Sequence, residues 1–169
     1  MKWKQKIRRI SMFNTETFEA WFESQCGTGK PCANFYPIDD EQKNIISDLK
    51  GLVNGLTLVL FQPEIKSEGT NVDSINDIYR GLIFVLQYGL DKNSSRFESR
   101  KAERKATFEA TLKVRQNIID IARGTTCHFW NFLRYDSFEI HRVGPVFDGF
   151  YGWSLDFDFT INTDSYGSF

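Results

Sequence analysis

The sequence lacks any run of roughly 18 or more apolar residues, so it predicts no transmembrane helix. The stretch Met1–Ile10 is basic, but no apolar segment follows it, which argues against a secretory signal. Cysteine is also scarce: Cys26, Cys32 and Cys127 are the only three in 169 residues. An odd number in a chain of this length does not predict a disulfide framework, and free thiols suit a reducing cytosol.

The sequence also has no large excess of basic or of acidic residues. The chain carries 21 basic and 22 acidic residues, for a net charge of −1. A dedicated nucleic-acid-binding domain usually carries a strong basic excess, so we do not expect one here. The segment Gly27–Lys30 is no phosphate loop either, because Ser24 occupies the first glycine position of that motif and Pro31 follows the lysine.

Histidine is limited to His128 and His141. A zinc site made of the three cysteines and His128 would need a Cys-x5-Cys spacing, outside the usual range, and two adjacent ligands. Adjacent side chains on a helix point about 100° apart, which works against convergence on one metal ion. We therefore expect no metal and no cofactor.

Aromatic residues, in contrast, are abundant: they make up 15% of the chain, with 16 Phe and 4 Trp. Such side chains dominate both protein cores and interfaces. The interior of a small monomer has limited room for so many rings, so we predict that some of them face a partner. The candidate partner contacts are Trp3, Phe18, Trp21, Trp130 and Tyr151.

Periodicity, caps and turn residues predict the order of the elements. The expected helices and strands are an amphipathic helix over 1–12, a helix over 15–25 capped by Asn14 or Thr15, a loop over 26–37, a helix over 40–53, a strand over 56–61, a polar loop over 62–78, a strand over 79–89, a long helix over 95–123, a short helix over 126–135, and strands over 138–143 and 153–161.

The last strand has the clearest pattern. Apolar residues from Trp153 to Ile161 alternate with polar ones from Ser154 to Thr160, which is typical of a half-buried antiparallel strand. The whole order predicts an α+β fold, with a four-stranded antiparallel sheet and the long helix packed on one face. We divide the chain into an N-terminal arm and helix (1–38), an α+β core domain (39–162) and a polar tail (163–169).

Two carboxylates in this strand, Asp156 and Asp158, share one face and lie about 7 Å apart by strand rise. Such a pair can bind a divalent metal or act in acid/base catalysis, here with His141. The alternation alone already predicts polar residues at these positions, and acids discourage aberrant edge pairing. A solvated sheet face is therefore the favoured interpretation.

The element order over roughly 40–162, and the segment Phe147–Phe159 with its turn and alternating aromatic strand, resemble those of bacteriophage tail terminator, tail completion and neck proteins. The resemblance implies a tail-terminator-like fold and a non-enzymatic virion structural protein that forms a homo-oligomeric ring, a hexamer or a dodecamer. It also implies portal, neck or tail proteins as partners. Genomic DNA would pass through the ring without sequence specificity, and the protein would be in the virion and, during assembly, in the host cytoplasm.

Two alternatives belong to other classes of function. One is a metal-dependent enzyme that uses the strand carboxylates Asp156 and Asp158. The other is a host-encoded interaction module with no connection to a phage.

Overall fold

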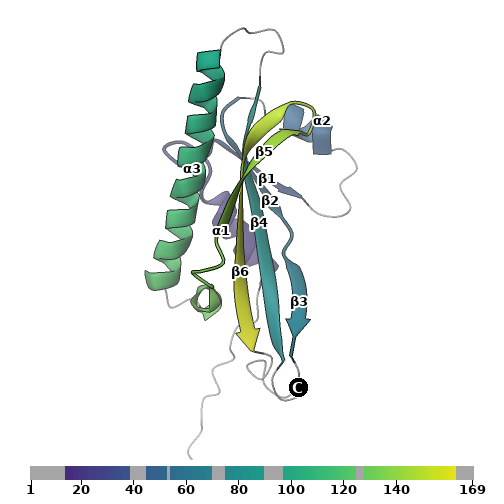
Figure 1. Cartoon of the computed structure of the whole chain (residues 1–169), viewed down its shortest axis with the longest axis vertical. Helices are drawn as coiled ribbons and strands as arrows, with labels where there is room; N and C mark the ends of the chain where they lie inside the picture. Colours follow the sequence, from purple (N-terminus) through teal and green to yellow (C-terminus); the bar gives the residue numbers. More distant parts are fainter. Residues whose placement is uncertain are drawn as a thin grey trace, which may run out of the picture.

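A computed structural model describes residues 14–38, 45–52, 54–69, 75–89, 97–124 and 128–162. The chain folds as an α+β protein with a mixed sheet of six strands and one long helix, which runs along one side of the sheet in Figure 1. The elements are α1 (Thr15–Glu23), β1 (Asn34–Ile38), α2 (Ile45–Lys50), β2 (Thr57–Phe61), β3 (Glu64–Glu68), β4 (Asn76–Tyr88), α3 (Phe97–Gly124), the 3-10 helix η1 (His128–Phe132), β5 (Glu139–Val146) and β6 (Phe150–Asn162).

The centre of the sheet is the antiparallel pair β4 and β6. These strands have 13 residues each and pair along their whole length, from Asn76 opposite Asn162 to Tyr88 opposite Phe150. The strand order is β1-β2-β4-β6-β5, and β3 pairs with the part of β4 that extends past β2. Among the strands that the structure describes, β1 and β2 are the one pair that runs parallel. The outer strands β3 and β5 therefore lie at opposite edges of the central pair.

The sheet is larger than the predicted four antiparallel strands because β1 and β3 fall in segments predicted as loops. All five residues of β3 are exposed, so no apolar alternation marks it, and Pro63 separates it from β2. β1 is short and contains Pro37, which an edge strand tolerates. Both strands form because a neighbouring strand provides backbone hydrogen-bond partners. Local sequence patterns do not indicate whether such a neighbour is present.

Several predicted elements are confirmed with small shifts of their ends: α1, β2, β4, α3, β5 and β6. Asn14 caps α1, because its Oδ1 accepts hydrogen bonds from the backbone N–H groups of Glu16 at 2.8 Å and Thr17 at 3.2 Å. The short helix predicted over 126–135 is the 3-10 helix η1. The helix predicted over 40–53 is confirmed for 45–50, and its predicted start lies outside the described residues, as do the helix over 1–12 and the tail.

The larger core lies between the sheet and the helices α1, α3 and η1. It combines the inward-facing residues of β6, such as Phe157 and Phe159, with side chains from all three helices. Phe18 and Phe22 of α1 are 2% and 0% exposed, so the 1–38 segment packs into the same core as the rest of the chain. Residues from both sides of position 38 therefore contribute to this core.

A second, smaller core covers the opposite face of the sheet near the β5–β6 hairpin, where α2 lies (Figure 1). Leu49 of α2 contacts a cluster that includes Leu86 and Phe150, all three being 0% exposed. At this level Gly152 of β6 lies against the backbone of β4, and any Cβ at this position would overlap the carbonyl oxygen of Val85. A glycine is required here for the two central strands to approach each other.

Candidate functional site

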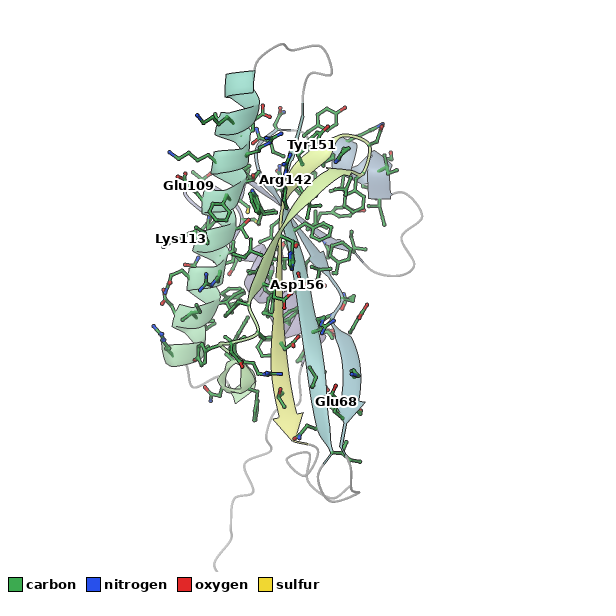
Figure 2. All side chains as sticks on the ribbon, viewed as in Figure 1. Glu68, Glu109, Lys113, Arg142, Tyr151 and Asp156 are labelled. Atoms are coloured by element: carbon green, nitrogen blue, oxygen red, sulfur yellow. The ribbon has the colours of Figure 1, made fainter. Side chains whose placement is uncertain are left out.

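The face of the sheet opposite α3 carries a cluster of charged side chains beyond the smaller core. We call it the polar sheet face; its members are Arg80, Glu139, His141, Asp156 and Asp158. Strand alternation places them there, because the odd-numbered neighbours in β6, such as Leu155 and Phe157, are buried on the helix side. Figure 2 shows Asp156 near the middle of the sheet.

The register of the strands determines which of these groups are neighbours. Arg80 pairs with Asp158 across β4 and β6, and Glu139 pairs with Asp156 across β5 and β6. Arg80 Nε lies 3.5 Å from Asp158 Oδ1, and His141 Nε2 lies 3.2 Å from Glu139 Oε2. Two ion pairs therefore flank a place where two carboxyl groups, Asp156 and Glu139, lie opposite each other.

The surroundings of Asp156 change how readily its carboxyl group ionises. Burial raises the pKa of its carboxyl group, and the neighbouring charge of Glu139 adds to the rise. His141 and Arg80 oppose the shift, as does a hydrogen bond from Ser154. The net effect is a carboxyl group that gives up its proton less readily than an ordinary aspartic acid.

The arrangement does not favour a metal centre. Within the described ranges, no three or more His, Cys, Asp or Glu side chains come together in a way that could hold a metal ion. Asp158 contacts Arg80, and His141 contacts Glu139, so the proposed metal ligands Asp158 and His141 already have partners. The zinc set that includes Cys127 lies in part outside the described residues.

The five predicted partner contacts have different places in the structure. Phe18 and Trp130 are each 2% exposed and lie in the larger core, where Trp21, half-buried, has its ring 4.7 Å from that of Trp130. Tyr151 is 41% exposed and lies near the β5–β6 hairpin (Figure 2). Trp3 lies outside the described residues.

The aromatic residues of the described ranges are thus largely accommodated by the chain's own two cores. In the part of the chain that the structure describes, the exposed large hydrophobic side chains are Ile46, Ile65, Leu112, Tyr135 and Tyr151, with no Phe or Trp among them. The high aromatic content therefore does not by itself require a partner. Burial of Phe18 and Trp130 within the monomer explains both residues without an interface.

Sequence reasoning missed the strand β3, and with it the surface that β3 forms at the edge opposite β5. Every residue of β3 is exposed, and Ile65 in its middle is 61% exposed. No residue of β5 is fully buried, and Glu139, His141 and Arg142 are exposed. The sequence of β3 contains one apolar residue, Ile65, between polar residues. A single apolar residue is too weak a pattern to predict a strand.

Comparison with known proteins adds no relative: no protein-family model matches this sequence, and no curated protein matches it significantly. None of the helices in the described ranges is long and apolar enough to cross a lipid bilayer. The functional argument therefore rests on the geometry of the sheet and its edges.

Proposed function

We propose that this chain is a non-catalytic structural subunit that assembles with copies of itself into a ring. The observation that carries the proposal is the presence of two outer strands, β3 and β5, at opposite edges of the central pair of one sheet, with all five residues of β3 exposed and Glu139, His141 and Arg142 of β5 exposed. Ring closure needs two different surfaces on each subunit, because the contacts run head to tail. Two opposite edges provide such surfaces.

Edge strands favour association for a specific physical reason. Their outer backbone N–H and C=O groups have no strand partner, so they can bind another chain unless charges, proline or bulges prevent it. At one edge Ile65 provides an apolar side chain that is 61% exposed, and near the other edge Tyr151 provides an aromatic side chain that is 41% exposed. Residues of this kind are common anchors of interfaces.

The element order supports a more specific proposal, that the ring belongs to the head–tail junction or the tail of a phage, as in tail terminator proteins. A long helix against a sheet and a closing hairpin with an alternating strand are the features on which the resemblance rests. In this proposal the subunits contact portal, neck or tail proteins, and the genome passes through the ring. A net charge of −1 and an ion-paired polar sheet face suit passage of DNA without tight binding.

The test is the native mass of the full chain, measured by native mass spectrometry and sedimentation over a range of concentrations. We expect a ring that Ile65→Lys weakens on the order of tenfold or more, because a lysine charge would have to be buried at the edge contact. Leu112→Lys is the matched control: Leu112 is also an exposed apolar residue, at 36%, but it lies on α3 away from both edges. This control should assemble like the parent chain.

Two outcomes would contradict the proposal. One is a chain that stays monomeric at every concentration, with or without phage tail and portal proteins. The other is equal weakening by Ile65→Lys and Leu112→Lys, which would show that the contact does not involve the edge at β3.

A further inference from the structure

Two cysteines flank a tight loop between α1 and β1. Cys26 and Cys32 face each other in an isolated parallel bridge, and the five residues Gly27–Pro31 lie between them. The backbone N–H of Gly27 donates to the carbonyl of Cys32 at 2.9 Å, and the N–H of Cys32 donates to the carbonyl of Gln25 at 3.4 Å. Side chains of directly paired residues lie on the same side of the backbone, so the two thiols are neighbours.

The spacing of this bridge fits a disulfide. Neighbouring strand segments lie about 4.7–4.9 Å apart, and a disulfide requires Cα atoms about 4.4–6.8 Å apart. The neighbouring Cys26 thiol, followed by burial, raises the pKa of the Cys32 thiol, and Cys26 Sγ itself donates a hydrogen bond to the carbonyl of Phe22 at 3.9 Å. Little backbone movement would be needed to join the sulfur atoms.

The two cysteines differ in their access to solvent. Cys32 is 1% exposed and packs in the larger core, whereas Cys26 is half-buried. The loop between them bends through Gly27 and Gly29, whose φ angles of 119° and 75° suit glycine and few other residues. A small reagent in solvent can therefore reach the Cys26 thiol, whereas the Cys32 thiol is buried beneath Cys26.

We propose that Cys26 and Cys32 are a reversible redox pair that forms a disulfide by exchange with a low-molecular-weight disulfide such as oxidised glutathione. The Cys26 thiolate attacks one sulfur of oxidised glutathione, whose S–S bond breaks, and one glutathione thiolate leaves. The Cys32 sulfur then attacks Cys26 and gives its proton to the departing glutathione sulfur, which releases the second glutathione as a thiol. Two protein thiols are oxidised, and one glutathione disulfide is reduced to two thiols.

The bond would tie the end of α1 to the start of β1. This junction is already attached to α3, because Asn117 Nδ2 donates a hydrogen bond to Gln25 Oε1 at 2.7 Å. A disulfide that closes so short a loop removes conformations mainly from the unfolded chain. We expect the oxidised chain to melt about 5–10 °C higher than the reduced chain.

The experiment equilibrates the folded full chain with defined ratios of reduced and oxidised glutathione. Free thiols are then blocked with N-ethylmaleimide, and tryptic peptides are weighed. The pair lies in one tryptic peptide, Ile10–Lys43, because Pro31 blocks cleavage after Lys30, while Cys127 lies in Gly124–Arg134. We expect Ile10–Lys43 to lose two hydrogen atoms and take up no reagent, and dithiothreitol to reverse this.

Single variants test the order of attack. Cys32→Ser, or Cys32→Ala if the serine disturbs the core, should stop at a stable glutathione adduct on Cys26. Cys26→Ser should leave Cys32 unmodified in the folded chain. The proposal is overturned if the parent chain keeps both thiols reactive in strongly oxidising buffer, if it accumulates the glutathione adduct without closing, or if Cys26 pairs with Cys127 instead.

Discussion

Substitution of Trp130 distinguishes a role in the core from a role in an interface. The sequence predicts a partner contact at this residue, whereas the structure buries its side chain. Its ring lies among those of Trp21 at 4.7 Å, Phe159 at 5.6 Å and Phe18 at 6.2 Å. Trp130→Ala would remove most of these ring contacts and leave a cavity between η1, α1 and β6. We therefore expect a large loss of stability with no separate effect on assembly.

Two estimates of the stability lost in Trp130→Ala agree. Aromatic side chains bury about 150–250 Å², which at about 25 cal/mol per Å² corresponds to roughly 4–6 kcal/mol. Measured Trp→Ala or Phe→Ala substitutions in cores cost about 3–5 kcal/mol. A domain with a stability of about 5–15 kcal/mol would lose about a fifth of it or more. With a urea slope of about 2 kcal/mol per M, the unfolding midpoint should fall by about 2 M.

The assay is urea unfolding followed by circular dichroism, because removal of a tryptophan alters fluorescence directly. Tyr135→Ala is the matched control: it removes an aromatic side chain that is 51% exposed and should change the stability by about 0.5 kcal/mol or less. The reasoning is refuted if Trp130→Ala keeps the parent midpoint within the error of the control and instead abolishes self-association.

Three further predictions concern the backbone, a titrating carboxyl group and a helix cap. Gly152→Ala should destabilise the chain by about 1–3 kcal/mol in urea unfolding, because its Cβ overlaps the Val85 carbonyl oxygen, whereas Gly124→Ala, with open space at the end of α3, should be neutral or slightly stabilising. Burial raises the pKa of Asp156 above the ordinary value of 3.8 for an aspartic acid. Ionisation of this carboxyl group therefore lowers the stability of the folded chain as the pH rises from 3.8 through the raised pKa. Asp156→Asn should therefore gain in melting temperature relative to the parent over this range, and a difference that does not change with pH would contradict the cause. Asn14→Ala should cost about 1 kcal/mol in urea unfolding through loss of the α1 cap, and no change would mean that other groups satisfy the N–H groups of the first turn.

The parts of the fold that could be predicted are those in which local pattern and tertiary environment agree. The alternation from Trp153 to Ile161 predicted β6, and Asn14 marked the start of α1. β3 could not be predicted, because its five exposed residues contain no apolar alternation and it forms only by pairing with β4. The predicted partner contacts show the same limit, since side-chain type did not distinguish a buried ring such as Trp130 from an exposed one such as Tyr151.

The sequence by itself determined the class of fold, the positions of most helices and strands, and the polar nature of one face of β6, because these follow from periods of two and 3.6 residues and from capping side chains. Tertiary structure alone decided the six-stranded mixed sheet, the pairing of Arg80 with Asp158, and the contact between Cys26 and Cys32. These features depend on which backbone segments meet, and that depends on how the whole chain satisfies its hydrogen bonds and fills its two cores.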